Sequence, residues 1–187
     1  MNVLALTGPP CAGKSTIVSI LEDLNVPCKD TGDAIRDEAH RRYDDPDEDM
    51  IWEVAGSIRD EHGNAGPTKM AAPWIDEQDS NLVCISSLRD QAEVEWLRDN
   101  VGPTLTLRIE ASQYSRCERY VNLKLSDDEK RGSITRERVL ELHKECVDRE
   151  ERESPYPDHD CIIRNEDSVS MRDLYEKLDH IVSVAKL

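Results

Sequence analysis

The most chemically informative segment of the chain lies close to its N-terminus. Residues 8–15 read GPPCAGKS and match the pattern G-x-x-x-x-G-K-[ST] at every fixed position. The apolar run Val3–Leu6 predicts a strand before this segment, and an apolar stripe predicts a helix from about Lys14 to Leu24 after it. Backbone N–H groups in such a loop, together with the helix N-terminus, attract phosphate oxygens. The segment therefore predicts a nucleoside triphosphate site, with ATP as the expected ligand.

The residue types in this loop suit contact with a triphosphate. Lys14 can reach the β- and γ-phosphates, and the Ser15 hydroxyl can hold Mg²⁺. Gly13 lets the backbone approach the phosphates without a clash from a Cβ atom. The predicted ATP-binding residues of the loop are Gly8, Pro9, Pro10, Cys11, Ala12, Gly13, Lys14, Ser15 and Thr16.

A second candidate segment, Thr31–Arg36, reads TGDAIR and follows the short predicted strand Val26–Lys29. Arg36 lies one helical turn beyond Asp33, and an arginine side chain suits bidentate binding of a phosphate group. An ordinary helix start, capped by Thr31 or Asp33, is the alternative interpretation.

A third candidate, Arg89, closes the segment SSLR directly after the predicted strand Leu82–Ile85. The continuous apolar character of this strand is typical of burial on both faces of a sheet. Arg89 is therefore expected at the edge of the sheet where ligands bind, and pairing with Glu93 at the i,i+4 spacing is the alternative.

A P-loop near residue 8 followed by TGDxxR resembles the nucleoside monophosphate kinases, adenylate kinase above all. The resemblance implies that Thr31, Arg36 and Arg89 contact the acceptor nucleotide. It also implies that Asp33 orients water around the magnesium ion. The chain departs from the family pattern at Ser86, where a carboxylate is usual, and this departure weakens the expected metal site.

Two arginine-rich helical patterns lie in the second half of the chain. In the nucleotide kinases that this sequence resembles, the corresponding lid donates arginines to the transferring phosphoryl group. The resemblance implies a lid over residues 116–152, with Arg119, Arg149 and Arg152 as candidate catalytic residues. Acidic neighbours leave a salt-bridged surface as the alternative, and the four-cysteine lid of some such kinases is absent, which predicts a short lid without metal.

The last predicted strand, Asp160–Arg164, is followed by a polar loop. The resemblance places this loop against the base of the donor nucleotide, with Asn165 as a candidate contact. Capping of the final helix is the equal alternative. That helix is predicted over about Val169–Val184, with Ser168 as its N-cap.

Short apolar runs alternate with helical patterns along the whole chain, which predicts an α/β fold with a parallel sheet. The expected architecture is a three-layer P-loop NTPase fold in a single domain, residues 1–187. The five predicted strands are Val3–Leu6, Val26–Lys29, Leu82–Ile85, Thr104–Ile109 and Asp160–Arg164.

The span between the second and third predicted strands is too long for a simple crossover. It predicts a helical acceptor-binding insertion over residues 31–80 that could close over a substrate. Its predicted helices are Gly32–Arg42, Glu48–His62 and Thr68–Glu77. Farther along, residues 127–132 form a polar break between the helices near Ser112–Leu123 and Thr135–Glu153.

The composition is strongly acidic. Among 187 residues there are 40 acidic and 24 basic side chains, giving a net charge of −16, and only 8 of the basic residues are lysines. This pattern resembles proteins of salt-loving archaea, since molar salt shortens the Debye length to about 3 Å and screens self-repulsion. The acidic balance argues against general nucleic-acid binding.

The cysteines and the apolar runs bear on location. None of the six cysteines forms a CxxC pair, which favours reduced thiols over a zinc site or disulfide framework. No stretch approaches the roughly 20 apolar residues of a membrane span, and the N-terminal segment lacks signal-peptide features. A cytoplasmic protein with nucleotide substrates and without membrane contact is expected.

Together the motifs predict an ATP-dependent phosphotransferase that uses Mg²⁺ and moves the γ-phosphate of ATP to a nucleoside or deoxynucleoside monophosphate. A small-molecule kinase resembling dephospho-coenzyme A kinase is one alternative. A nucleotide-dependent binding or regulatory protein with weak ATPase activity is another, and Ser86 is its best support. The pattern also resembles a little-characterised archaeal subgroup of adenylate-kinase-like P-loop proteins over most of the chain.

Overall fold

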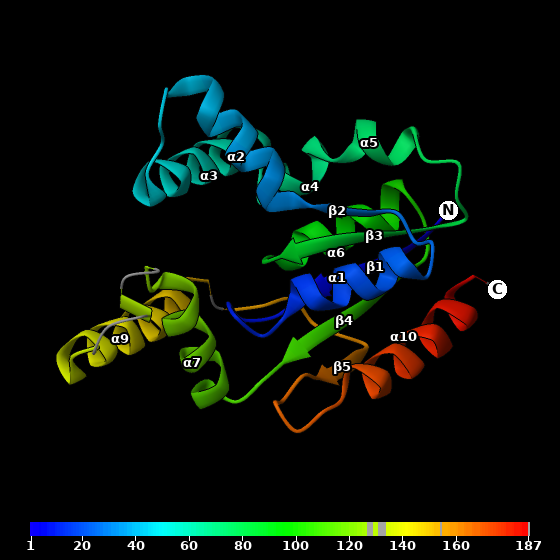
Figure 1. The fold of residues 1–187 in the computed structure, drawn as a ribbon. Coiled ribbons are helices and arrows are strands. Elements are labelled where there is room, and N and C mark those ends of the chain that lie inside the picture. The colour runs from blue at the N-terminus through cyan, green and yellow to red at the C-terminus, as the bar shows by residue number, and fades with distance from the viewer. Residues whose placement is uncertain (127–128, 131–133, 154, 187) are drawn as a thin grey trace.

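The centre of the molecule is a parallel five-stranded sheet, seen in a computed structural model that describes residues 1–126, 129–130, 134–153 and 155–186 (Figure 1). The strand order is β2-β3-β1-β4-β5, and every pairing is parallel. The strands are β1 (Asn2–Thr7), β2 (Cys28–Asp30), β3 (Leu82–Leu88), β4 (Thr104–Glu110) and β5 (Cys161–Arg164). The predicted parallel α/β fold with five strands is confirmed.

Helices cover both faces of the sheet because β1 has apolar side chains on both sides. On one face, Leu4 and Leu6 pack with buried side chains of α1 (Lys14–Asp23) and α10 (Met171–Ala185). On the other, Val3 and Ala5 pack with α6 (Gln91–Asn100). Successive residues of a strand point to opposite faces, so one short apolar run supplies two cores. The result is the three-layer arrangement expected of a P-loop fold.

Four helices occupy the connection between β2 and β3, and they lie along the β2 edge of the sheet in Figure 1. They are α2 (Thr31–Arg42), α3 (Glu48–His62), α4 (Gly66–Met70) and α5 (Ala72–Asp76). The side chains of Asp30 and Asp47 cap α2 and α3 by accepting hydrogen bonds from Gly32 N and Met50 N. Buried Ile35, Ala39, Val54, Ala55 and Ile58 give α2 and α3 a small core of their own.

The single helix predicted over residues 68–77 is wrong. The structure has two short helices there, and they meet at Ala71. Pro67 and Pro73 each lie at the first or second position of a helix. Proline has no N–H to donate within a helix, so Pro73 starts a new helix rather than continuing the preceding one.

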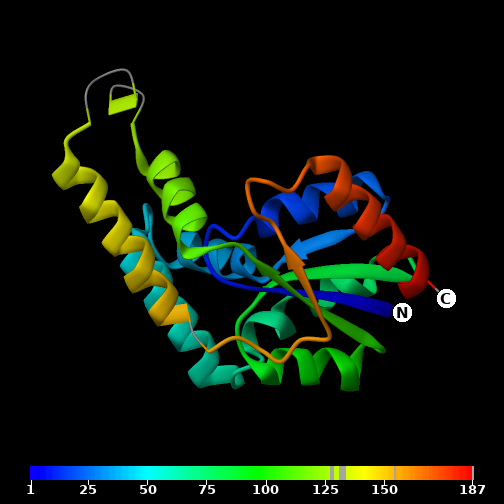
Figure 2. The same cartoon turned by 90° about the horizontal axis from the view of Figure 1, so that it is seen from below.

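The helices α7 (Gln113–Lys124) and α9 (Arg136–Glu153) run alongside each other beside the sheet (Figure 2). Tyr120 and Val121 of α7 share a buried cluster with Leu142 and Cys146 of α9. This packing makes the two helices one hairpin. The polar break predicted over residues 127–132 lies largely outside the described residues.

The start of the last helix also differs from the prediction. Ser168 is not its N-cap, because the chain first makes a turn in which Val169 N donates to Glu166 O. Ser170 caps α10 instead, with its Oγ accepting from Asp173 N at 3.1 Å.

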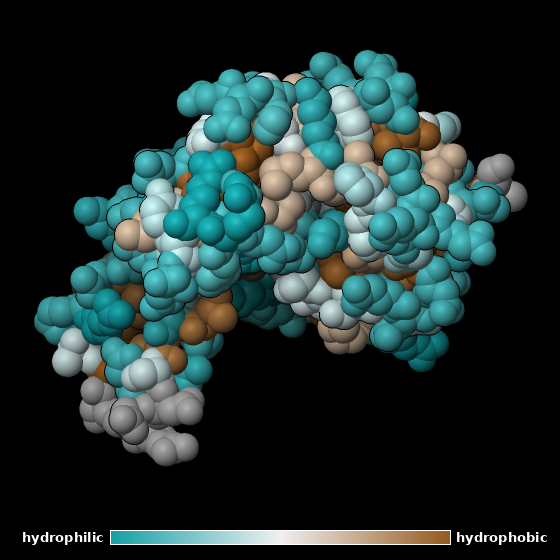
Figure 3. All heavy atoms as spheres, turned by 90° about the horizontal axis from the view of Figure 1, so that it is seen from above, coloured by the Kyte–Doolittle hydropathy of each residue, from teal (hydrophilic) through white to brown (hydrophobic). Residues whose placement is uncertain are grey.

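Charged and polar residues dominate the face seen in Figure 3, where apolar residues form small separate patches. Within the described part of the chain, no helix combines the length and the apolar character needed to cross a membrane. Among the residues that the structure describes, Glu93 and Glu153 are the only buried acidic ones, so most of the acidic side chains lie at or near the surface.

Candidate nucleotide-binding site

The loop between β1 and α1 has the backbone shape that its glycines allow. Gly8 and Gly13 have φ angles of +132° and +94°, which are strained for other residues. A Cβ atom on Gly13 would collide with the side-chain amide of Asn165, and one on Gly8 would collide with the carbonyl oxygen of Ile109. The segment GPPCAGK is thus packed tightly against β4 and the loop after β5.

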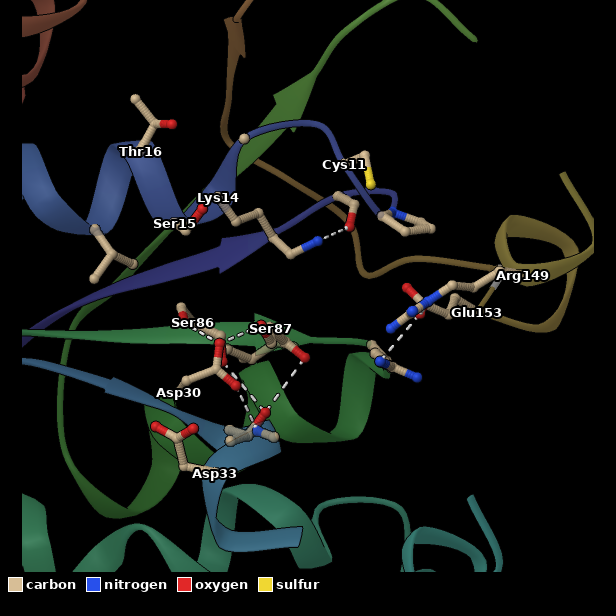
Figure 4. Close-up of a pocket in the computed structure, with 18 of the residues that line it drawn as sticks. Cys11, Lys14, Ser15, Thr16, Asp30, Asp33, Ser86, Ser87, Arg149 and Glu153 are labelled. Atoms are coloured by element: carbon tan, nitrogen blue, oxygen red, sulfur yellow. Dashed lines mark hydrogen bonds and ion pairs between the residues drawn. The ribbon is translucent and has the colours of Figure 1, made fainter. Parts of the chain in front are cut away.

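Lys14 lies over this loop. Its Nζ donates to the carbonyl oxygens of Gly8 and Pro9 at 2.6 and 3.0 Å. Figure 4 marks one hydrogen bond of Lys14 with a dashed line. Burial lowers the pKa of Lys14 to about 8, with Arg89 also lowering it and Glu153 acting in the opposite direction. A lysine held in this way can exchange its carbonyl partners for phosphate oxygens, which offer it a full negative charge.

Two residues that were predicted to bind ligands, Asn165 and Arg119, donate hydrogen bonds to backbone carbonyl groups of the loop. The Asn165 side chain donates to Ala12 O at 2.9 Å, and Arg119 donates to Cys11 O at 3.3 Å. Arg119 also donates to Asn165 O at 2.8 Å and pairs with Asp167 at 2.6 Å. These contacts tie the P-loop to α7 and to the loop after β5.

The P-loop opens into a cavity of about 710 Å³ at the carboxyl ends of the strands. Four predicted site residues are not part of its lining: Pro9, Ala12, Arg152 and Asn165. The predicted residues that do line it are Gly8, Pro10, Cys11, Gly13, Lys14, Ser15, Thr16, Thr31, Asp33, Arg36, Arg89, Arg119 and Arg149. Residues from both halves of the chain, predicted for donor and acceptor alike, therefore share one cavity.

Asp30, which sequence reasoning missed, supplies a carboxylate beside Ser86. The two residues are partners in the register of β2 and β3, and Asp30 Oδ2 accepts from Ser86 Oγ at 2.8 Å and from Ser87 Oγ at 2.5 Å (Figure 4). Asp30 Oδ1 accepts from Gly32 N at 2.7 Å. The carboxylate that is missing at position 86 is thus supplied by the adjacent strand. The sequence feature that could have pointed to Asp30 is its position at the end of the predicted second strand.

Oxygen donors at this side of the cavity fit a magnesium ion. The Ser15 hydroxyl and the Asp30 carboxylate both line the cavity, and Mg²⁺ in nucleotide sites takes one or two such protein ligands together with phosphates and water. Asp33 also lines the cavity, but its carboxylate pairs with Arg36 at 2.5 Å. Arg36 is therefore held by an internal partner in this structure.

Thr31 and Arg89 lie at the end of β3. The Thr31 hydroxyl, which is buried, donates to Ser86 O at 3.2 Å and so helps to fix the turn after the strand. The guanidinium group of Arg89 pairs with Glu153 at 3.2 Å. Pairing of Arg89 with Glu93 is wrong, because the Glu93 carboxylate accepts from the backbone N of Arg89 at 2.7 Å and caps α6.

Two further residues of the cavity were missed, Arg59 and Glu153. Arg59 belongs to α3. The sequence pattern predicted this helix, but it did not indicate that Arg59 faces the cavity. Glu153 is the last residue of α9 and accepts from Arg149 Nε at 3.0 Å. An acidic residue inside an arginine-rich helix is ambiguous in sequence, since most such residues are solvated.

The fold and the loop define the class as a P-loop kinase-like nucleotide-binding domain. A family model described as an AAA domain matches residues 4–141. A UPF0200 protein from Methanoregula boonei is 30% identical over 140 residues, covering 74% of this chain and 77% of that protein. The chain therefore belongs to the AAA domain family and to the archaeal UPF0200 proteins.

Other relatives agree with this placement. A UPF0200 protein of Halobacterium salinarum is 31% identical over 109 residues, which is 57% of each chain. Among solved structures, a shikimate kinase from Bacteroides thetaiotaomicron superposes with a TM-score of 0.59 at 18% identity, covering 97% of this chain and 98% of that one. At that identity the likeness establishes the fold.

Proposed function

We propose that this protein is an ATP-dependent phosphotransferase, with a nucleoside or deoxynucleoside monophosphate as the phosphoryl acceptor. One observation carries the proposal: the P-loop and the basic side chains of the β2–β3 connection line the same cavity. Six basic side chains line it against three carboxylates, in a protein whose net charge is −16. Such a cavity favours anionic ligands, and two phosphorylated substrates meet that requirement.

The proposed roles follow from position. The P-loop and Lys14 hold the triphosphate, and the magnesium ion at Ser15 and Asp30 supplies charge neutralisation when bound. Arg36, Arg59 and Arg89 orient the acceptor phosphate, while Arg119 and Arg149 face the phosphoryl group in transfer. Residues 31–80 act as the acceptor-binding part and the α7–α9 hairpin as the lid that excludes water.

The test is ADP formation from Mg·ATP with a panel of ribonucleoside and deoxyribonucleoside monophosphates, in about 1 M KCl to screen the acidic surface. Stimulation by one acceptor, and its loss in Lys14→Ala, is the expected result. If no monophosphate raises ADP formation above the background hydrolysis rate, the proposed acceptor class is wrong.

A second candidate is a kinase that phosphorylates a hydroxyl group, in the manner of dephospho-coenzyme A kinase. The presence of both Asp30 and Asp33 in the cavity lining favours it, because a carboxylate can accept the proton of an attacking hydroxyl. Small phosphorylated alcohols in the same panel separate the two candidates. Tight ATP binding without stimulation by any acceptor would instead indicate a nucleotide-dependent binding protein.

A further inference from the structure

The negative charge of Glu153 is disfavoured at its position by two physical effects. It is the last residue of α9, and the C-terminal end of a helix carries partial negative charge. Its side chain is also only 4% exposed, and burial of an unpaired carboxylate is strongly unfavourable. A charge in such a position requires close cationic partners.

Two arginines from different parts of the fold provide them. Glu153 Oε1 lies 3.2 Å from Arg89 Nη2, which follows β3, and 3.0 Å from Arg149 Nε on α9 itself. Figure 4 shows Glu153 and Arg149 on the side of the pocket away from Asp30 and Asp33. The negative charge of Glu153 also reaches Lys14, whose pKa it raises against the effect of burial. One carboxylate oxygen of Glu153 thus forms ion pairs with Arg89, on the proposed acceptor side, and with Arg149, in the proposed lid.

Arg89 and Arg149 also contact other side chains around the cavity, and Arg152 shares one of these partners. The guanidinium carbon of Arg89 lies 4.7 Å from the centre of the Trp52 ring, and that of Arg152 lies 5.5 Å from the same ring. Arg149 Nη1 lies 3.3 Å from Glu48 at the edge of α3. Arg89 is therefore held between a carboxylate and an indole, in a geometry that an incoming anion must change.

We propose that Glu153 is a specificity-determining residue of the acceptor subsite, acting as an internal counter-ion that an acceptor anion must displace from Arg89 and Arg149. This inference rests on the proposed function, which assigns Arg89 to the acceptor. A free phosphate ion must displace Glu153 to reach these arginines, and it is too small to contact the rest of the cavity wall at the same time. A complete acceptor molecule gains further contacts with the cavity wall, so Glu153 selects such molecules over small anions.

The test is the affinity of the full chain for inorganic phosphate, measured by isothermal titration calorimetry without ATP or acceptor. Glu153→Gln keeps the size of the side chain and removes its charge. We expect the Glu153→Gln variant to bind phosphate at least about tenfold more tightly than the wild type, because two half-buried guanidinium groups lose their shared carboxylate.

Glu48→Gln is the matched control, since it removes a more exposed carboxylate from Arg149 outside the cavity lining. Its phosphate affinity should change by less than about threefold, the scale of an exposed ion pair. An absent gain in Glu153→Gln, or an equal gain in Glu48→Gln, overturns the proposal.

A second variant locates the bound ion. Arg89→Gln in the Glu153→Gln background should return phosphate affinity to the wild-type level. A gain that persists there means that phosphate binds elsewhere, the P-loop included, and this also overturns the proposal.

If Glu153→Gln does not fold, Glu153→Asp takes its place. The shorter carboxylate cannot hold both guanidinium groups at the observed distances, so a smaller gain is expected, and no gain overturns the proposal. Phosphate binding requires neither ATP nor turnover. Its outcome is therefore independent of the acceptor panel, which alone decides the proposed kinase activity.

Discussion

At the scale of single residues, Lys14 combines a required charge with a half-buried position in the cavity wall. In the free protein its ammonium group has only carbonyl oxygens as hydrogen-bond acceptors, and burial lowers its pKa to about 8. A lysine with a lowered pKa is charged below that value and neutral above it. The pH range in which the P-loop carries its full charge is therefore narrower than for an exposed lysine.

The first prediction is that ATP binds more weakly as the pH rises through about 8. Between about pH 7 and about pH 9.5 we expect the dissociation constant to increase by roughly 30-fold, because binding must then restore the proton on Lys14. Fluorescence or calorimetric titration with ATP at a fixed KCl concentration measures this dissociation constant at each pH. In Lys14→Ala the affinity should be weak at every pH, and a pH dependence retained in that variant would assign the effect to another group.

The second prediction concerns the neighbouring carboxylate. Asp30→Asn should lower the rate of phosphoryl transfer or the affinity for Mg²⁺ by roughly 10–100-fold, because Asp30 is the carboxylate of the proposed metal site. Ser86→Ala should cost much less, since Ser86 donates one of three hydrogen bonds to Asp30. Steady-state rates against Mg²⁺ concentration measure both variants. Equal losses would mean that Ser86 itself contacts the metal or the substrate.

At the scale of elements, capping residues and turns next to a helix determine where the helix begins, whereas contacts between distant segments determine which side chains meet in the site. The closing helix shows the first effect, because Ser168 and Ser170 are equally good capping residues in sequence. The turn between Glu166 and Val169 uses the backbone near Ser168, so the helix begins only after Ser170. A choice between two serines two positions apart depends on a turn that the sequence pattern does not specify.

The third prediction follows from this difference. Ser170→Ala should lower the free energy of unfolding by about 1 kcal/mol, since Asp173 N loses its side-chain acceptor at the start of α10. Ser168→Ala is the matched control and should change it by less than about 0.5 kcal/mol. Urea denaturation followed by circular dichroism gives both values. A larger loss in Ser168→Ala would show that the helix begins earlier in solution.

The P-loop strand and helix could be predicted from sequence because apolar periodicity and a fixed motif coincide there. Asp30 and Glu153 could not, for different reasons. Asp30 matters through its register with Ser86, which is a property of strand pairing rather than of local sequence. Glu153 matters because Arg89 lies 64 positions away in the chain and meets it only when α9 packs near the end of β3.

At the scale of the whole molecule, charge is divided between surface and cavity. The chain carries a net charge of −16, while the cavity lining has twice as many basic as acidic side chains. The surface seen in Figure 3 is largely hydrophilic, and its acidic groups repel one another at low ionic strength. The local field of the cavity favours anions, which the rest of the molecule repels.

The last prediction is that KCl stabilises the folded chain. Raising KCl from about 0.1 M to about 1 M shortens the Debye length from about 10 Å to about 3 Å, so repulsion among the surface carboxylates is largely screened. We expect the urea midpoint to rise steadily, by the equivalent of about 2 kcal/mol, which is a large part of the stability of a domain of this size. Urea is chosen because it is uncharged and leaves the ionic strength under control. A separate series with sucrose in place of KCl shows how much stabilisation arises without screening. A midpoint that is unchanged by KCl, or that rises equally in sucrose, would contradict an electrostatic origin and with it the inference that this acidic chain is adapted to salt.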